Sequence, residues 1–141
     1  MELLADTTFL IDLWREVGAP GPATGYARTH SALQTAISWV VAGEFLAGAA
    51  AAGQDIELTK AFLARYPILH SDAATVRRYG DIYATLRTRN RLIGPNDLWI
   101  AACALANDLP ILTRNVDAFG RVNGLHVIDY SMDHDDRPIG H

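Results

Sequence analysis

Four acidic residues of this chain stand where carboxylates could be gathered to do chemistry. Asp6 directly follows the apolar run Leu3-Leu4-Ala5, which predicts a short buried strand that ends in an acid. Asp97 lies in the first turn of a predicted helix, and Asp117 follows another apolar run, Ile111-Leu112. In an open parallel sheet, ligands bind outside the carboxyl ends of the strands. These acids are therefore candidates for one common site.

Glu44 is the most informative of the four acids because of the residues around it. Val41, Glu44, Phe45 and Gly48 have the spacing i, i+3, i+4, i+7, which is one face of a helix. An acid thus falls within an apolar stripe, and a buried carboxylate is costly unless it is paired or binds a metal. No matching cation lies close to Glu44 in the sequence.

Carboxylates that meet without a counter-charge raise each other's pKa and repel one another. A bound divalent cation removes this conflict, and oxygen ligands alone favour hard ions such as Mg²⁺ or Mn²⁺. The pattern therefore indicates metal-assisted phosphoryl chemistry. Each acid also has a purely structural interpretation: Asp6 as a turn residue, Glu44 as an exposed helix acid, Asp97 as an acid matched to the helix dipole, and Asp117 as a loop acid. Four acids at strand ends and adjoining helix starts favour the functional interpretation.

The elements that must position these acids alternate between short apolar runs and helical periodicity. This alternation predicts parallel βαβ units and a three-layer α/β/α sandwich with a mostly parallel sheet. We expect residues 18–25, rich in Gly, Pro and Ala, to form a loop whose tail runs to about residue 30. Residues 115–123 are expected to form a loop or a short helix. The predicted strands are 3–5, 35–39, 67–70, 110–113 and 126–128, and the predicted helices are 7–17, 40–51, 55–65, 72–88 and 95–106.

Two of these helices carry apolar stripes that predict which of their faces are buried. In the helix that begins at Pro95, the stripe is Leu98, Ala101, Ala102 and Leu105. In the helix before it, we expect four residues to point inward: Val76, Tyr79, Tyr83 and Leu86. The small residues of the first stripe allow that helix to approach the sheet closely.

The composition is that of an ordinary folded protein. The chain has 141 residues, of which 50% are hydrophobic and 20% are charged, and this argues against disorder. We expect a single domain over residues 1–131 and a polar tail, residues 132–141, that frays. A lone cysteine rules out an internal disulfide framework. No apolar run is long enough to span a bilayer and no secretory leader pattern is present, so we expect a cytoplasmic protein.

The positive charge is unusual in its kind and its place. The net charge of −4 gives no bulk attraction to nucleic acid, yet all but one of the 12 basic residues are arginine. Arginine forks suit phosphate and carboxylate partners. Five of the arginines lie close together in one segment: Arg77, Arg78, Arg87, Arg89 and Arg91. This segment is either a solvated helix face or a surface that binds phosphates.

Four blocks of sequence carry a family resemblance. They are Leu4-Ala5-Asp6-Thr7-Thr8; Glu44 after Ile37-Ser38; Ile93-Gly94-Pro95-Asn96-Asp97 with Ile100-Ala101-Ala102; and Leu112-Thr113-Arg114-Asn115 with Phe119. Together these blocks resemble the PIN domain, and more narrowly the VapC-type toxins of toxin–antitoxin pairs. The resemblance covers essentially the whole chain, with the blocks in order and at the family's spacing.

This resemblance implies an endoribonuclease that depends on Mg²⁺ or Mn²⁺ and acts on tRNA, rRNA or mRNA. The implied catalytic and metal-binding residues are Asp6, Glu44, Asp97 and Asp117. The implied orienting residues, which would hydrogen-bond these carboxylates, are Thr7, Thr113 and Asn115. The implied RNA-binding residues are Arg114, Arg87, Arg89 and Arg91. A small antitoxin that covers the site is the implied protein partner.

A second copy of the chain is the other expected partner. The resemblance implies a homodimer, and some large apolar residues exceed what one small sheet can bury. These residues are Trp39, Phe62 and Trp99.

Two positions depart from the family's pattern. Thr8 stands where asparagine is common after the Asp-Thr pair, and Ala118 stands where an acid usually precedes the phenylalanine. Asp117 lies one residue earlier than that acid. Either Asp117 turns into the site or Asn115 fills the position through water, and the sequence leaves both open.

Two other functions fit part of the pattern. A non-catalytic RNA-binding or scaffold PIN domain would share the fold but would show no metal-dependent RNA cleavage. An aspartyl-phosphate receiver or phosphatase-like protein has a similar α/β layout, but such sheets generally use a lysine near the acids. Lys60, the only lysine, falls in a mid-chain helix, which disfavours this alternative.

Overall fold

The strands form one parallel sheet that runs through the middle of the molecule. The computed structural model describes residues 1–132, so the predicted tail lies outside the described residues except for Met132. The strands are β1 (Leu3–Ala5), β2 (Thr35–Ser38), β3 (Ile68–Leu69), β4 (Ile111–Thr113) and β5 (Val127–Asp129), in the order β3-β2-β1-β4-β5. Every neighbouring pair is parallel, which confirms the predicted sheet.

β1 lies at the centre of the sheet, and the chain extends from it in two directions. It adds β2 and β3 on one side and then returns to add β4 and β5 on the other. The carboxyl ends of β1 and β4 are neighbours: Ala5 pairs with Leu112, and the Asp6 amide donates to the Leu112 carbonyl at 2.9 Å. Such a reversal of strand order is where open α/β sheets bind ligands.

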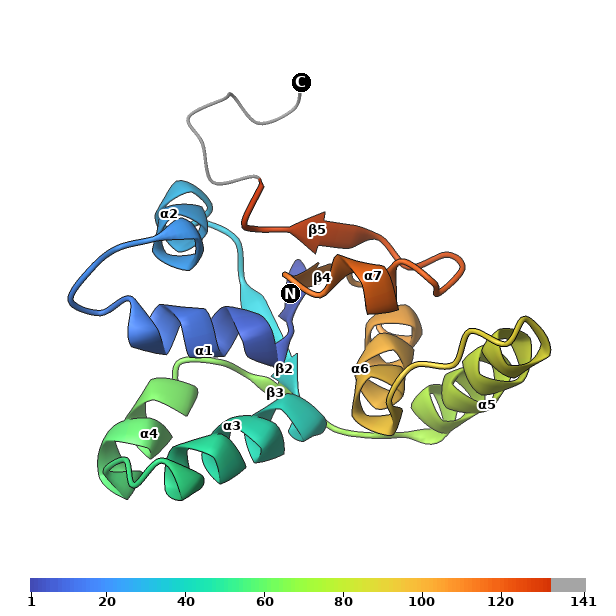
Figure 1. The fold of residues 1–141 in the computed structure, drawn as a ribbon, viewed down its shortest axis with the longest axis horizontal. Coiled ribbons are helices and arrows are strands. Elements are labelled where there is room, and N and C mark those ends of the chain that lie inside the picture. Colours follow the sequence, from blue (N-terminus) through green and yellow to red (C-terminus); the bar gives the residue numbers. More distant parts are fainter. Residues whose placement is uncertain (133–141) are drawn as a thin grey trace.

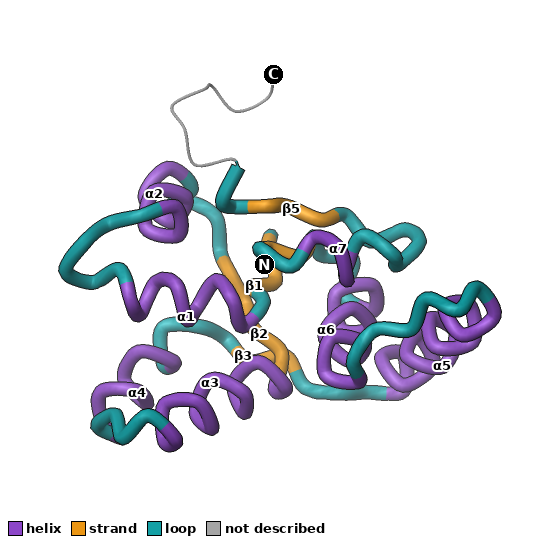
Figure 2. The backbone as a smooth tube through the Cα atoms, viewed as in Figure 1, coloured by secondary structure: helices purple, strands orange, loops and turns teal. Residues whose placement is uncertain are grey.

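Helices cover both faces of the sheet and confirm the three-layer arrangement. They are α1 (Thr7–Arg15), α2 (Pro22–Thr29), α3 (Trp39–Ala51), α4 (Ile56–Leu63), α5 (Ala73–Thr88), α6 (Pro95–Ala106) and α7 (Val116–Phe119). The first four lie on one side of the sheet and the last three on the other (Figures 1 and 2). Within residues 1–132, none of these helices has both the length and the apolar character needed to cross a membrane.

Polar side chains begin three of the helices, as capping residues do. The Ser38 side chain accepts from the Val41 amide at 3.2 Å, which starts α3 directly after β2. Asp55 caps α4, and Asp72 caps α5 by accepting from the Thr75 amide at 2.9 Å. These caps turn the chain sharply from strand or loop into helix.

The prediction of a loop over residues 18–25, with a tail to about residue 30, was wrong. Residues 22–29 form α2, and Pro22 stands at its first position, where a missing N–H is no disadvantage. The helix has a second support that no local pattern reveals, because it comes from the end of α1.

That support is the Glu16 carboxylate. It accepts hydrogen bonds from the backbone amides of Gly21, Ala23 and Thr24 at 2.9, 3.3 and 2.8 Å. These bonds satisfy amide donors at the start of α2 that would otherwise lack partners. Burial raises the pKa of Glu16, but the hydrogen bonds outweigh burial and hold the pKa below its ordinary value of 4.5.

The predicted inward face of α5 was partly wrong. Leu86 is buried and Tyr79 is partly buried, but Val76 is 55% exposed and Tyr83 is 37% exposed. Ile82 is buried instead. The reason is that α5 stands at one end of the molecule and packs mainly against α6, so its buried stripe is narrow and rotated from the predicted one (Figure 1).

α6 is buried nearly all round because it lies between the sheet and α5. Its predicted stripe is buried, with Leu105 only partly so. Ile100, Cys103 and Ala104 on its other sides are buried as well. The small side chains let the helix lie close to both neighbours, and this fixes the position of its first turn.

An aromatic cluster fills the space between α1, α3 and α4. Phe62 stacks on Phe45 with ring centroids 5.2 Å apart and meets Trp14 edge-on at 5.4 Å. Phe62 is therefore buried in the core, and the prediction that it exceeds what the fold can bury was wrong. It offers no apolar surface to a second copy.

Candidate active site

Asp6 is the first residue after β1 and lies almost completely out of water, with 3% of its surface exposed. Its Oδ2 accepts hydrogen bonds from the Thr113 hydroxyl at 2.8 Å and from the Thr8 hydroxyl at 3.1 Å. Thr113 ends the neighbouring strand β4, and Thr8 lies in the first turn of α1. Burial raises the pKa of Asp6 above its ordinary value of 3.8, while the hydroxyl hydrogen bonds act against this rise.

Glu44 reaches the same place from the second turn of α3. The Thr7 hydroxyl donates to Glu44 Oε1 at 2.5 Å, and Asn96 Nδ2 donates to Glu44 Oε2 at 3.1 Å. Residues from α1 and α6 thus orient both of its oxygens. The charge of Glu44 contributes to the raised pKa of Asp6 and of Asp97, which identifies these three carboxylates as electrostatic neighbours.

Asp97 lies in the first turn of α6 and is partly buried. Asn115 Nδ2 donates to Asp97 Oδ2 at 3.2 Å, and the Asn115 amide donates to the Thr113 hydroxyl at 2.8 Å. Burial first, and then the charges of Asp6 and Glu44, raise the pKa of Asp97 from 3.8 to about 6. A carboxyl group with such a pKa is half-protonated at mildly acidic pH.

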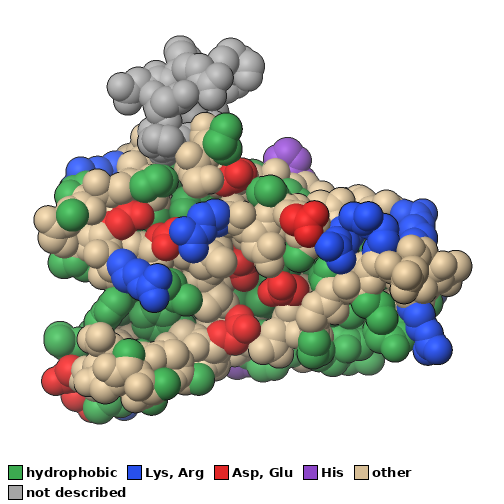
Figure 3. Space-filling view, viewed as in Figure 1, with side chains coloured by type: hydrophobic (Ala, Val, Ile, Leu, Met, Phe, Trp, Pro, Cys, Tyr) green, Lys and Arg blue, Asp and Glu red, His purple; other side chains and the backbone are tan. Residues whose placement is uncertain are grey.

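We call Asp6, Glu44 and Asp97 the acid cluster. Within residues 1–132, the ion pairs join residues outside this cluster, so no Lys or Arg neutralises it. Figure 3 shows acidic side chains in the middle of one face of the molecule. Carboxylates gathered in this way repel one another unless a cation joins them.

The acid cluster suits a hard divalent cation by its chemistry. Its ligand atoms are all oxygens, and hydroxyl and amide donors orient the carboxylates from behind. As the side chains stand, no three His, Cys, Asp or Glu groups among residues 1–132 converge into a ready ligand set. Mg²⁺ usually keeps several waters and needs only one or two carboxylates, so a looser cluster fits it. These three acids are the residues that could hold such an ion.

Asp117 is placed differently from the other three predicted ligands. Its side chain is 80% exposed and pairs with Arg121 Nη2 at 2.9 Å. No contact seen among residues 1–132 links it to the acid cluster. Asn115 contacts Asp97 directly, so of the two possibilities left open by the sequence, the contacts favour Asn115.

Arg114 lies at the edge of the acid cluster. Its backbone amide donates to the Thr8 hydroxyl at 3.2 Å, and its side chain, 53% exposed, pairs with Asp12 Oδ2 at 3.2 Å. The buried Tyr130 hydroxyl donates to the same Asp12 oxygen at 2.5 Å. The other predicted RNA-binding residues are exposed at the end of α5 and in the loop before α6: Arg87, Arg89 and Arg91.

Sequence reasoning assigned no role to two residues of this site, Thr8 and Asn96. Thr8 joins Asp6 to Arg114, and Asn96 joins Glu44 to the start of α6. The sequence did contain a signal for both residues. Each is a polar residue in the first turn of a helix and lies within two positions of a predicted metal ligand. That signal does not say which way the side chain turns.

The fold and the site together define a class of protein. Its members are α/β/α sandwiches that carry a carboxylate cluster where the strand order reverses. Residues 3–125 match the PIN domain. The chain belongs to the PIN domain family, which confirms the resemblance carried by its four sequence blocks.

Proteins of similar sequence carry ribonuclease names. The tRNA(fMet)-specific endonuclease VapC of Shigella flexneri is 36% identical over 78 residues, which are 55% of this chain and 59% of that protein. The chain thus spans about three fifths of the length of this relative. Ribonuclease VapC1 of Methanocaldococcus jannaschii is 28% identical over 130 residues, which are 91% of this chain and 88% of that protein.

Solved structures share the fold over nearly the whole chain. VapBC-1 from nontypeable Haemophilus influenzae superposes with a TM-score of 0.79 and 29% identity, covering 93% of this chain and 99% of that one. A toxin–antitoxin complex from Klebsiella pneumoniae superposes with a TM-score of 0.69 and 27% identity, covering 92% and 98%.

Proposed function

We propose that the protein is the toxin of a toxin–antitoxin pair and a divalent-metal-dependent endoribonuclease that cleaves RNA phosphodiester bonds. The acid cluster carries the proposal: three carboxylates are electrostatic neighbours without a counter-charge, and the pKa of Asp97 is raised to about 6. Membership of the PIN domain family and the ribonuclease names of similar proteins support the same function. RNA is the substrate and the cytoplasm is the proposed place of action.

The chain's own residues hold and orient the reacting groups. When bound, Mg²⁺ or Mn²⁺ supplies a Lewis acid that lowers the pKa of a water and offsets charge on the phosphate. The acid cluster would hold the ion. Its hydroxyl and amide donors keep the carboxylates in place, which limits reorganisation during the reaction. The Arg114 side chain is 53% exposed, so its N–H donors are accessible to a phosphate oxygen next to the cleaved bond. Asp117 would join the ligands only after its pair with Arg121 opens.

RNA cleavage by the purified protein tests this proposal. We expect cuts in the presence of Mg²⁺ or Mn²⁺ and none in EDTA, and we expect the ends mapped after induced expression to fall at a small set of sites. Asp6→Asn should abolish cleavage, whereas Glu57→Gln, which changes an exposed acid of α4, should not. Equal cleavage by wild type and Asp6→Asn would overturn the proposed mechanism.

We propose that a cognate antitoxin inhibits the enzyme by covering the acid cluster with a basic side chain. A groove of about 410 Å³ lies between α1 and α3 and is lined by Trp14, Phe45 and Glu44, among others. Figure 3 shows this hollow with hydrophobic side chains along it. An apolar segment can pack there while an Arg or Lys reaches the carboxylates. A toxin–antitoxin complex that keeps full nuclease activity would contradict this arrangement.

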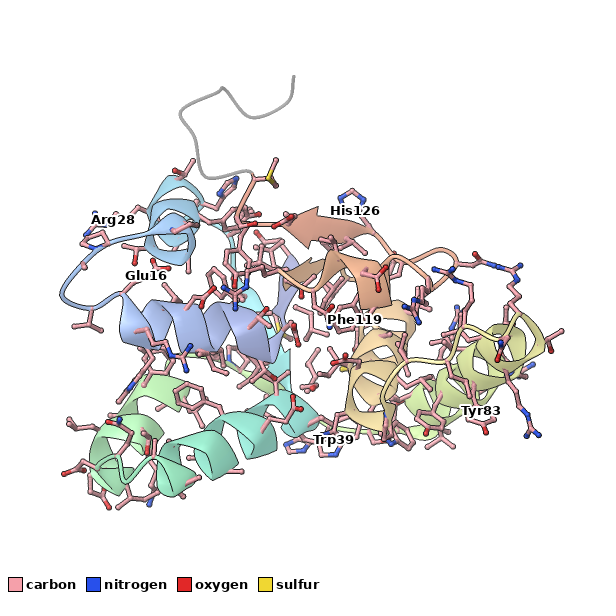
Figure 4. All side chains as sticks on the ribbon, in the orientation of Figure 1. Glu16, Arg28, Trp39, Tyr83, Phe119 and His126 are labelled. Atoms are coloured by element: carbon pink, nitrogen blue, oxygen red, sulfur yellow. The ribbon has the colours of Figure 1, made fainter. Side chains whose placement is uncertain are left out.

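We also propose that the protein is a homodimer. Trp99 stacks on Tyr79 with ring centroids 4.0 Å apart and meets Trp39 edge-on at 5.8 Å. Val76 and Tyr83 share the Tyr79 face of α5 and are exposed, and Figure 4 shows Trp39 and Tyr83 along the same edge of the molecule. A second copy would remove this apolar surface from water. Sedimentation that finds only monomer at micromolar concentration would refute the dimer.

A non-catalytic RNA-binding PIN protein is the second candidate. The observation that favours it is the pairing of Asp117 with Arg121, which leaves the acid cluster with three carboxylates instead of four. This candidate predicts RNA binding without metal-dependent cleavage, so the cleavage assay described above separates the two functions.

A further inference from the structure

Arginines crowd the end of α5 and the loop that leads to α6. Arg87, Arg89 and Arg91 are all exposed. The ion pairs within residues 1–132 use other arginines, so none of these three has an acidic partner there. On a chain with a net charge of −4, this is a local concentration of unpaired positive charge. We call residues 87–92 the arginine loop.

Arg121, which follows α7, holds the arginine loop in place. Arg121 Nη1 donates to the carbonyls of Leu92 and Arg91 at 3.1 and 3.4 Å. Arg121 Nη2 pairs with Asp117 at 2.9 Å, which fixes the guanidinium from its other end. The Arg91 amide also donates back to the last turn of α5. These contacts hold the exposed arginines at a defined position relative to α5 and α7, instead of leaving them on a loose connection.

The arginine loop and the acid cluster are neighbours along the chain. Arg91 and Asp97 are six residues apart, and six residues span at most about 20 Å. On the other side of the cluster, the exposed Arg114 is tied to Thr8 beside Asp6. Figure 3 shows Lys and Arg side chains gathered over the α5 end of the same face that carries the acids. A polyanion lying across the acid cluster would therefore meet positive charge on both sides.

We propose that the arginine loop binds the phosphate backbone of single-stranded RNA where the strand leaves the acid cluster. Arg114 holds the strand on one side of the cleaved bond, and the arginine loop holds it on the other. The chemistry suits this role, because guanidinium forks bind phosphate oxygens in pairs and remain charged at all physiological pH values. The inference rests on the proposed ribonuclease function and assigns the surface that gives this acidic protein its affinity for RNA. It also gives the Asp117–Arg121 pair a positioning role in holding that surface.

The test compares a double variant, Arg89→Gln with Arg91→Gln, with a control of equal charge change, Arg28→Gln with Lys60→Gln. The control residues are exposed on α2 and α4. Each protein is assayed on a long single-stranded RNA that wild type cuts and on the shortest fragment of it that wild type still cuts. KM and kcat are measured over a range of salt concentrations, and melting curves verify that all variants are folded.

We expect the arginine-loop variant to bind the long RNA more weakly while its kcat stays the same. Single-strand contacts contribute about 0.7 to the salt slope per phosphate, so two lost contacts should lower the slope by about 1.4 and raise KM about 25-fold at 0.1 M salt. The short fragment should be cut with unchanged KM and kcat, because it does not reach the loop. The control variant should behave as wild type on both substrates.

An arginine-loop variant with wild-type KM and salt slope on the long RNA would overturn the inference. So would a variant that binds RNA normally but escapes inhibition by the antitoxin, because the surface would then belong to the protein partner. If wild type cuts no RNA with any metal, the proposed function fails by itself. Direct binding of the long RNA, measured by fluorescence anisotropy for the same variants, would then decide the arginine-loop inference separately.

Discussion

Replacing Asp97 by asparagine should separate metal binding from folding, because the two depend on the Asp97 charge with opposite signs. Asparagine has nearly the same shape and keeps an oxygen that can accept the Asn115 hydrogen bond, but it removes one negative charge from the acid cluster. We expect the variant to lose RNA cleavage and growth toxicity. We also expect it to be more stable than wild type when no metal is present.

The size of this gain follows from the pKa of Asp97. Burial, together with the charges of Asp6 and Glu44, raises it from 3.8 to about 6, and at about 1.4 kcal/mol per pKa unit the ionised group destabilises the fold by about 3 kcal/mol at most. Solvent screening and the α6 N-terminus, which favours a negative charge by about 0.3–1 kcal/mol, reduce this penalty. We expect a net gain of about 1 kcal/mol, equivalent to about 3 °C in Tm.

The gain has a defined pH dependence. The folded-state pKa of Asp97 is raised, so its protonated form stabilises the fold fully below pH 3.8 and loses this effect as the pH rises through about 6. Asparagine does not titrate, so the advantage of the variant should be largest above about pH 7 and should vanish near pH 4. Mg²⁺ should reverse the order at neutral pH, because an ion that binds the folded wild type stabilises it.

Urea unfolding in EDTA and in Mg²⁺ over this pH range measures these effects, and RNA cleavage across a metal titration measures activity. Glu57→Gln is the matched control, since Glu57 is also a first-turn helix acid but is exposed on α4. It should lose only a few tenths of a kcal/mol and keep full activity. A fully active Asp97→Asn protein, or one less stable than wild type in EDTA at neutral pH, would refute the reasoning.

Three further perturbations have defined outcomes. Asp117→Asn should reduce cleavage far less than Asp97→Asn, and raised Mn²⁺ should restore it; equal loss at every Mn²⁺ concentration would show that Asp117 is a full ligand. Glu16→Ala should destabilise the fold by about 1–3 kcal/mol at pH 7 in urea melts, because amides at the start of α2 lose their acceptor. Since the pKa of Glu16 is held below 4.5, this difference should shrink as the pH falls through that lowered value, and a constant difference would contradict the capping role. Val76→Glu, on the exposed face of α5, should convert a dimer to monomers in sedimentation, and an unchanged mass would exclude this face from the interface.

Local sequence patterns were sufficient for most of the fold. Alternation of apolar runs with helical periodicity predicted all five strands, and the observed bounds differ by a residue or two at the ends. Short apolar runs bounded by turn residues indicate buried strands, and apolar residues three and four apart indicate helices, so each element reports its own type. The fold class followed because parallel strands need helical crossovers between them.

Two features of the fold depended on contacts between distant elements. α2 exists in a segment rich in Gly and Pro because Glu16, at the end of α1, caps it from outside. The buried face of α5 differs from the predicted one because α5 packs mainly on α6 at one end of the molecule, where exposure of Val76 and Tyr83 is tolerated. Neither the cap nor the main packing partner leaves a local signal.

By itself, the sequence determined the parallel sheet and pointed to four carboxylates. Ends of apolar runs mark Asp6 and Asp117, helix periodicity marks Glu44, and the first turn of a helix marks Asp97. Only the tertiary structure decided that Asn115 contacts Asp97, while Arg121 draws Asp117 toward the arginine loop. The physical reason is that a periodic pattern determines which side of its own element a residue faces. The partner of a charged group depends instead on the direction in which its side chain points. For Asp117 this direction is determined by the rotation of the single-turn helix α7 and by neighbours that the fold brings from distant parts of the chain.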